Sequence, residues 1–403
     1  MAAKDPRQAR YRRTMAWAGG GSWEPSPPEP PPPPDPRAVR VLRKTTTPPS
    51  AFGPAEEPRQ GRGLILGCFL PPHLGHQFLI DFARQYVTDL TILLCSTPQD
   101  PIPGERRLGW LREMCPDGLV MHLPNTVPLA DLKDEAARRH WVETIRHYIS
   151  TPDYLFASED PARLVAEALG AKYVPVDRQR SSVPISGRVV RADPLANWRF
   201  LPPCVRPYYV RRVCLLGPES TGKSTLARQL ADQFATVAVG EYARTLRESR
   251  QGDLEAEDMQ QVARGQRAAE EALARQADRV LICDTDLLSV WLWCERLFGL
   301  CPEWIRAEAG RRRPDLYLLT EADVPFVGDP AFDEPEERQA FGRRCLRVLR
   351  SQKRPYVRIR GSWDDRFHRA RAAVRKLLRP LPAPDQSAEK PPSQPEVETD
   401  DGS

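Results

Sequence analysis

RRVCLLGPESTGKSTLARQL, residues 211–230, is the stretch that decides the fold. An apolar run typical of a buried strand leads into GPESTGKS, residues 217–224, and a helical pattern follows. GPESTGKS fits the Walker A pattern, which requires this strand–loop–helix context. In such a loop the glycines let backbone N–H groups point at a phosphate chain, the lysine reaches the β- and γ-phosphates and the serine binds magnesium. The residues predicted to hold a nucleotide are Gly217, Glu219, Ser220, Thr221, Gly222, Lys223, Ser224 and Thr225.

Strands and helices alternate on both sides of this loop, which predicts an α/β fold with two open parallel sheets. In the first block we expect strands at 63–67, 90–95, 153–158 and 172–176, with helices at 76–86 and 161–170. In the second block we expect strands at 210–217, 236–242, 279–286, 315–320 and 356–361, with helices at 225–234, 254–277, 287–299 and 365–378. The predicted organisation is a Rossmann-like domain over 62–204 and a P-loop kinase-like domain over 205–380, joined by a Pro-containing connector at 192–208. The Pro-rich segments 1–61 and 381–403 are expected to be disordered.

Composition excludes several classes of protein. The chain has 403 residues and a net charge of +5, with its arginines scattered along helices, so nucleic-acid binding is not indicated. Nine cysteines without a C-x-x-C pair indicate reduced, buried thiols in a cytoplasmic protein. No apolar stretch approaches the ~20 residues that span a bilayer, and the Arg-rich N-terminus lacks the apolar core of a secretory signal.

Acidic residues follow two strands of the second block. A kinase needs a magnesium ligand and a group that takes the proton of the acceptor hydroxyl. We expect Asp284 to share the magnesium ion with Ser224, and either Glu241 or Asp286 to lie near the acceptor. Arg244 is a further candidate for a phosphate contact. Two tryptophans of the next helix, Trp291 and Trp293, are expected to pack in the core rather than stack on a ligand.

A second candidate site lies in GCFLPPHLGH, residues 67–76, directly after the first strand. His73 and His76 flank Gly75 where a helix begins, and ligands of open α/β sheets bind beyond the carboxyl ends of strands at the switch point. A helix N-terminus there favours an anion such as a nucleotide phosphate.

The HxGH segment resembles the nucleotidylyltransferase superfamily, whose second motif, I-S-x-x-x-x-R, matches residues 185–191. The resemblance implies that His73 and His76 stabilise charge on the α-phosphate of ATP, and that Ser186 and Arg191 bind the β- and γ-phosphates. Phe69 and Gly75 complete the predicted nucleotide-binding set. Read from the residues alone, Ser186 is also a plausible helix N-cap.

A nucleotidylyltransferase followed by a Walker A kinase resembles the bifunctional NadR-type enzymes, nicotinamide-mononucleotide adenylyltransferases fused to ribosylnicotinamide kinases. The resemblance covers residues 63–378 and is most specific at the junction, NWRFLPPCVRPYYVRRVCLLGPESTGKSTL. It implies ATP and Mg²⁺ as cofactors, nicotinamide riboside and nicotinamide mononucleotide as substrates, and NAD and pyrophosphate as products. A homo-oligomer is possible.

Three positions depart from that family. Cys68 stands where a lysine is usual, and Arg188 stands at a variable threonine position, where its charge could compensate. The kinase segment at 325–332 keeps Asp329 but lacks the usual glycine and arginine. Two alternatives therefore stay open: a coenzyme A enzyme combining pantetheine-phosphate adenylyltransferase with dephospho-coenzyme A kinase, and a nucleotide-sensing protein with impaired catalysis. The proline-rich N-terminus cannot form a helix-turn-helix, so DNA binding is not expected.

Overall fold

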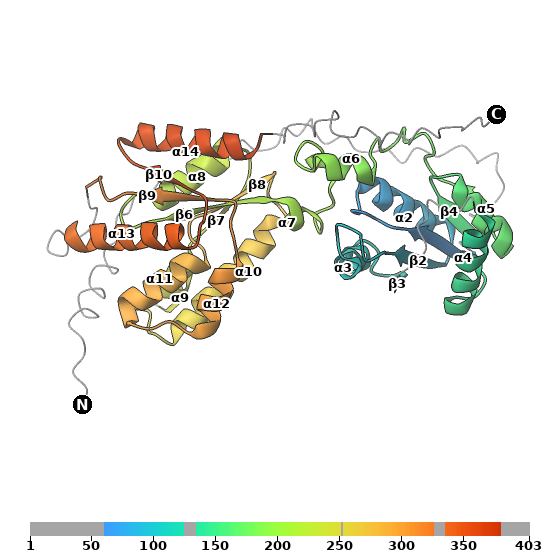
Figure 1. Ribbon diagram of the computed structural model, residues 1–403, viewed down its shortest axis with the longest axis horizontal. Helices are drawn as coiled ribbons and strands as arrows, with labels where there is room; N and C mark the ends of the chain where they lie inside the picture. Colours follow the sequence, from blue (N-terminus) through green and yellow to red (C-terminus); the bar gives the residue numbers. More distant parts are fainter. Residues whose placement is uncertain (1–59, 125–133, 251–252, 326–334, 380–403) are drawn as a thin grey trace, which may run out of the picture.

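The computed structural model describes residues 60–124, 134–250, 253–325 and 335–379. Two parallel five-stranded sheets, each flanked by helices, follow one another along the chain (Figure 1). The α/β class predicted from the sequence is therefore confirmed. The Asp329 position and almost all of the expected tails, 1–61 and 381–403, lie outside the described residues.

The first sheet has the strand order β3-β2-β1-β4-β5, with every neighbouring pair parallel. Its strands are β1 (Arg62–Gly67), β2 (Asp89–Cys95), β3 (Leu119–Leu123), β4 (Tyr154–Ala157) and β5 (Lys172–Pro175). Its helices are α2 (Leu74–Tyr86), α3 (Gly104–Met114), α4 (Glu135–Tyr148) and α5 (Pro161–Leu169), followed by the short α6 (Gly187–Ala192). The chain order reverses between β1 and β4, so the switch point lies where β1 runs into α2.

The second sheet has the order β10-β9-β6-β8-β7 and is also all parallel. Its strands are β6 (Arg211–Leu216), β7 (Ala238–Val239), β8 (Val280–Cys283), β9 (Leu316–Thr320) and β10 (Tyr356–Ile359). Its helices are α8 (Lys223–Gln233), α9 (Tyr242–Arg250), α10 (Asp258–Ala274), α11 (Leu287–Phe298), α12 (Glu303–Arg311), α13 (Pro335–Ser351) and α14 (Trp363–Leu377). The Walker loop leaves the central strand β6, again at the switch point.

Both faces of each sheet are covered, which explains the near-continuous apolar strands. In β1, Leu64 packs into one core and Ile65 into the core on the opposite face. In β6, the side chains of Val213 and Cys214 likewise pack into different cores, on opposite faces of the sheet. The two sheets can therefore hold their carboxyl-terminal edges, and the loops that follow, in fixed positions.

The connector is more structured than its prolines suggest, since it contains the 3₁₀ helix η2 (Trp198–Phe200) and the short helix α7 (Arg206–Tyr209). The indole N–H of Trp198 donates to the carbonyl of Ala277, at 3.2 Å. Tyr208 packs edge-on against Trp110 of α3, with ring centroids 5.5 Å apart. The connector thus contacts α3 beside the first sheet and the segment between α10 and β8 beside the second.

Sequence patterns misplaced several element ends. The strand expected at 236–242 is only β7, because Tyr242 already begins α9 with its N–H bonded to the amide oxygen of Gln266 at 2.9 Å. The expected helix 254–277 is the shorter α10. The strand β3 and the helices α3, α4, α12 and α13 were not among the expected elements.

All nine cysteines are free, and all are buried except the half-buried Cys68. Within the described ranges, no helix has the length and apolar character needed to cross a membrane.

Candidate nucleotide sites

The HxGH histidines are held together by the start of α2. His73 is the N-cap, and its Nδ1 accepts the N–H of Gly75 at 3.1 Å. Nδ1 of His76 accepts the N–H of His73 at 3.2 Å, which completes a capping box. The two imidazoles stack with centroids 3.8 Å apart. A Cβ at Gly75 would come within 3.0 Å of the His73 ring, so the glycine makes room for the pair.

Both rings are neutral near pH 7. Burial, with the charge of Arg180, lowers the pKa of His73 to about 4. Burial first, then His73 and Arg180, holds the pKa of His76 well below its usual range. Because both Nδ1 atoms accept backbone N–H bonds, these hydrogen bonds assign the ring proton to Nε2. The pair can therefore offer two N–H donors without carrying charge.

The loop between β1 and α2 packs against the histidines. The ring of Phe69 is buried and lies 4.9 Å from the His76 ring, so Phe69 positions the histidine rather than presenting its own ring. The guanidinium of the fully buried Arg107 donates to the carbonyl of Cys68 at 2.5 Å and pairs with Asp100 at 2.5 Å. A buried cation therefore contacts the backbone of Cys68, the position where the resembling enzymes usually carry lysine.

The I-S-x-x-x-x-R segment packs against this loop. Ser186 is the N-cap of α6 and accepts the N–H of Val189 at 3.3 Å, as expected. Arg191 donates to the carbonyl of Leu70. A Cβ on Gly187 would lie 2.6 Å from the same carbonyl, so α6 approaches the loop closely. The structure thus brings both predicted motifs of the first site together.

Arg180 is a site residue that sequence reasoning missed. Its guanidinium bonds the carbonyl of Ile185 at 2.8 Å and the carboxylate of Glu159 at 3.2 Å, and its charge acts on both histidines. Burial raises the pKa of the Cys68 thiol. The charges of Arg107 and Arg191 act in the opposite direction. Arg188 is exposed on α6 and is not among these residues, so nothing supports the hypothesis that its charge replaces the lysine missing at Cys68.

The Walker loop has the backbone that its glycines predict. Gly217 has φ +147°, and a Cβ there would lie 2.4 Å from the carbonyl oxygen of Thr320 on β9. The Thr221 hydroxyl lies 2.9 Å from the Pro218 carbonyl and 2.7 Å from the Thr320 hydroxyl. Lys223 Nζ donates to the carbonyls of Gly217 and Pro218, at 3.0 and 2.5 Å. The lysine therefore lies over the first residues of the loop.

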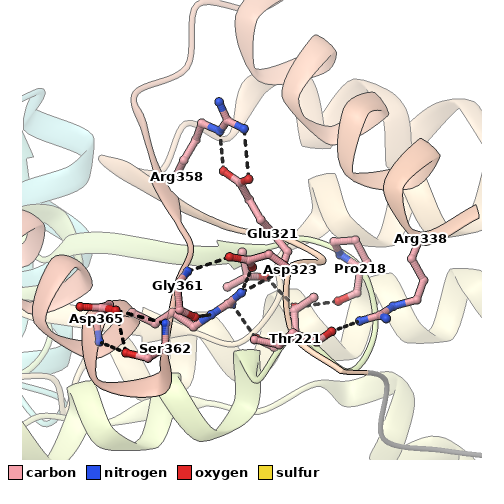
Figure 2. A network of polar contacts seen from close by, with 12 residues as sticks. Pro218, Thr221, Glu321, Asp323, Arg338, Arg358, Gly361, Ser362 and Asp365 are labelled. Carbon is pink, nitrogen blue, oxygen red and sulfur yellow. Dashed lines mark hydrogen bonds and ion pairs between the residues drawn. The ribbon is translucent and has the colours of Figure 1, made fainter. Parts of the chain in front are cut away.

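A buried arginine from the last helix ties the loop to the neighbouring strand ends. Arg366 of α14 donates to the carbonyl of Thr221 at 3.2 Å and to those of Gly361 and Glu321 at 3.0 Å each, and it pairs with Asp323. These partners lie side by side in Figure 2. Arg366 thereby links the Walker loop to the segments that follow β9 and β10.

A cavity of about 320 Å³, which we call the Walker cleft, opens beside the loop. Side chains from α9, α10 and α11 line its other walls. Its described lining comprises Gly217, Glu219, Ser220, Thr221, Gly222, Lys223, Ser224, Thr225, Glu241, Ala243, Arg244, Arg247, Asp253, Leu254, Met259, Val262, Gln266, Thr285, Ser289, Val290, Trp293 and Leu297. The volume falls within the range of small-molecule sites.

The structure separates the two acids that the sequence left open. Glu241 lines the Walker cleft with its side chain 28% exposed, and burial raises its pKa, opposed by Lys223. Asp286 instead caps α11: it accepts the N–H and hydroxyl of Ser289 at 3.0 and 3.1 Å and the Tyr317 hydroxyl at 2.5 Å. Asp286 therefore has a structural role, and of these two acids only Glu241 lines the Walker cleft.

The two predicted magnesium ligands, Ser224 and Asp284, carry side-chain oxygens, the kind of ligand that this ion prefers. Asp284 is buried, and its Oδ1 has no hydrogen-bond partner among the described residues. The Ser224 hydroxyl is contacted by Arg244 at 3.4 Å, and Arg244 lies 3.5 Å from Glu241. The described residues contain no group of three or more His, Cys, Asp or Glu side chains that could hold a metal alone. Magnesium would therefore need ligands from the nucleotide phosphates, as is usual for this ion.

Trp293 and Gln266 were not expected to line a site. Trp293 lines the Walker cleft and packs on Phe341 in a tilted arrangement, with ring centroids 4.4 Å apart. The indole N–H of Trp291 donates to the Glu295 carboxylate at 2.7 Å. The fully buried Gln266 donates to the carbonyl of Thr285 at 3.0 Å. Both tryptophans pack against the core as partly buried side chains, as predicted, and Trp293 also lines the Walker cleft.

The fold and the loop geometry define an α/β protein with two parallel five-stranded sheets and a P-loop after the central strand of the second. In agreement, the family model described as an AAA domain matches residues 212–366. The chain is similar to the trifunctional NAD biosynthesis/regulator protein NadR of Escherichia coli (strain K12), with 28% identity over 357 residues, 80% of this chain and 85% of the relative. NadR of Salmonella typhimurium (strain LT2) is 27% identical over 356 residues, with the same coverage.

Solved structures agree on the fold. The crystal structures of NadR protein in complex with NR, and in complex with NAD and AMP-PNP, each superpose with a TM-score of 0.63 at 22% identity. Each match covers 79% of this chain and 96% of the other.

Proposed function

We propose that the chain is a bifunctional enzyme of NAD synthesis. Its P-loop domain phosphorylates nicotinamide riboside with ATP, and its first domain joins the resulting mononucleotide to the adenylyl group of a second ATP, releasing pyrophosphate. The observation that carries the proposal is the pairing, in one chain, of a neutral HxGH pair and a Walker loop, each at the switch point of its own parallel sheet. The similarity to NadR along 80% of the chain supports the same order of sites.

In the kinase step, Glu241 takes the proton of the ribosyl 5′-hydroxyl. Burial raises the pKa of this carboxyl, which makes it a stronger base than a solvated carboxylate. Lys223 and the loop N–H groups hold the transferred phosphate, and Ser224 and Asp284 would hold Mg²⁺. The ion, when bound, neutralises charge on the phosphates.

In the adenylyl step, a phosphate oxygen of the mononucleotide attacks the α-phosphorus of ATP, and the bond to pyrophosphate breaks. The Nε2–H groups of His73 and His76 donate to the oxygens on which charge builds. Being neutral and preorganised, they need no proton change during the reaction. Arg180 and Arg191 add positive charge at the same edge of the sheet.

A product assay tests the proposal. The full chain is incubated with ATP, Mg²⁺ and nicotinamide riboside, and mononucleotide and NAD are resolved by chromatography. Parallel reactions receive phosphopantetheine. NAD from the riboside supports the proposal, dephospho-coenzyme A from phosphopantetheine would replace it with the coenzyme A function, and nucleotide binding without turnover would leave a sensing protein.

A further inference from the structure

An exposed indole lies against the Walker loop. Trp363 is the first residue of α14 and is 55% exposed. A Cβ built on Gly222 would fall 2.4 Å from Cζ3 of its ring. The ring therefore contacts the α-carbon of a Walker glycine, but Trp363 is not among the described residues that line the Walker cleft.

The ring is fixed in place from its own helix. Ser362 and Asp365 form a capping box, with the Asp365 N–H bonded to the Ser362 hydroxyl at 3.2 Å. The guanidinium carbon of Arg366 lies 5.5 Å from the centre of the Trp363 ring. Since Arg366 also bonds the Thr221 carbonyl, the indole and the Walker loop share one support. A surface fixed in this way loses little conformational freedom when a ligand covers it.

The direction of the phosphate chain decides which group reaches this ring. Lys223 Nζ lies at the carbonyls of Gly217 and Pro218, and a Walker lysine binds the β- and γ-phosphates. The γ end of the chain therefore lies over the start of the loop. Gly222 is at the other end of the loop, next to the first N–H groups of α8. Because backbone N–H groups of a P-loop bind the α- and β-phosphates, the α end of the chain lies on this side. The nucleoside attached to the α-phosphate leaves the loop beside Gly222.

We infer that the exposed face of Trp363 is the platform on which the purine of the phosphate donor stacks in the P-loop domain. The acceptor occupies the Walker cleft near Glu241, and the donor base lies outside it on the indole. Stacking on an aromatic ring tolerates any base, because every base has a π-face. Trp363 therefore supplies affinity for the nucleoside part of the donor without choosing between adenine and guanine. This inference rests on the proposed function only for the identity of the acceptor.

The test compares a nucleotide with its phosphate chain alone. Calorimetric titrations of the full chain with AMP-PNP and with inorganic tripolyphosphate, both in Mg²⁺, give the two affinities. The Lys223→Ala variant identifies the binding that belongs to the Walker loop. Trp363→Ala is expected to weaken AMP-PNP about 10- to 100-fold, the usual range for one base–aromatic stack. The affinity of Trp363→Ala for tripolyphosphate should stay within about threefold of the wild-type affinity, because tripolyphosphate has no base to stack and loss of a stacking contact would cost about tenfold.

Two further variants sharpen the result. Trp363→Phe should restore most of the AMP-PNP affinity, since phenylalanine keeps a stacking face, and should abolish any nucleotide-induced change in Trp363 fluorescence. Tyr148→Ala, at a ring 52% exposed on α4 of the first sheet, is the matched control and should change neither affinity.

Equal losses for AMP-PNP and tripolyphosphate would mean that Trp363 only packs on Gly222, and would overturn the inference. Unchanged AMP-PNP affinity in Trp363→Ala would also overturn it. If the wild type binds AMP-PNP through Lys223 with the expected Trp363 dependence but does not phosphorylate the riboside, the proposed function fails and the platform stands. If it shows no Lys223-dependent binding, both fail.

Discussion

Glu270 carries a buried carboxyl whose charge state should set the pH dependence of P-loop domain stability. Its side chain lies on α10 and is 4% exposed, and its Oε1 has no hydrogen-bond partner among the described residues. Its Oε2 lies 3.6 Å from Arg312 and 3.9 Å from Arg212, too far for hydrogen bonds. Burial, with the nearby charge of Asp286, outweighs both arginines and raises the pKa of Glu270 to about 8.

The sign follows from proton binding. The unfolded chain releases this proton near the ordinary pKa of 4.5, whereas the folded protein keeps it up to about pH 8. The folded state therefore binds more protons between these values, and stability falls by about 1.4 kcal/mol per pH unit as the pH rises. Over the whole window the loss is about 5 kcal/mol. Glu270→Gln cannot ionise and should escape it.

We expect the stability of Glu270→Gln relative to wild type to rise by about 3 kcal/mol between pH 5.5 and 8.5 and to level off above pH 8. Urea unfolding is measured at several pH values, with hydrogen exchange of the α10 amides as the probe. These amides report on the part of the chain that forms the second sheet. Glu271→Gln, at the neighbouring half-exposed carboxyl, is the control and should show little trend. If Arg212 and Arg312 instead hold Glu270 charged, its pKa in the folded protein lies at or below the ordinary value, and the stability of Glu270→Gln relative to wild type stays flat between pH 5.5 and 8.5. That outcome would refute the reasoning.

Four further outcomes are expected. Lys223→Ala should abolish riboside phosphorylation while NAD formation from supplied mononucleotide persists; loss of both in a folded variant would contradict two separate sites. His76→Ala should slow NAD formation at least about 100-fold and leave the kinase rate unchanged, by analogy with other preorganised donors. Arg366→Met should destabilise the second sheet and its helices by about 1–3 kcal/mol, because it removes the hydrogen-bond donor of three carbonyls. Calorimetry beside the exposed-site control Arg369→Met would show it, and equal melting temperatures would refute it. Cys68→Ser should keep the rate of NAD formation within about threefold of wild type, because burial raises the pKa of the Cys68 thiol and keeps it neutral. Loss of a charge-assisted contact would cost far more. A tenfold loss in a steady-state assay would assign the sulfur a direct role.

Features set by local spacing were accessible from the sequence. The Walker loop and the HxGH turn depend on neighbouring residues, such as Gly217 for its positive φ and His73 as a helix cap, so the pattern itself carries the geometry. The strand–helix alternation was sufficient to predict two parallel sheets. Element ends were less accessible, because Gln266, far along the chain, helps to start α9.

Features set by distant contacts were not accessible. Arg366 and Thr221 are 145 positions apart, and no local pattern distinguishes this arginine from its exposed neighbours on α14. Glu241 and Asp286 look equivalent as strand-end acids until Ser289 and Tyr317 occupy the oxygens of Asp286.

The attachment of the Walker loop to α14 has a consequence for how the protein is made. The first sheet is complete once Pro175 has left the ribosome, and domains generally fold as they emerge. The Walker loop, in contrast, rests on Thr320 and Arg366, which are synthesised long after the loop itself. The two sites therefore mature at different times during translation. A chain truncated before α14 would keep His73 and His76 but lack Arg366, so we expect its Walker loop to lose this support.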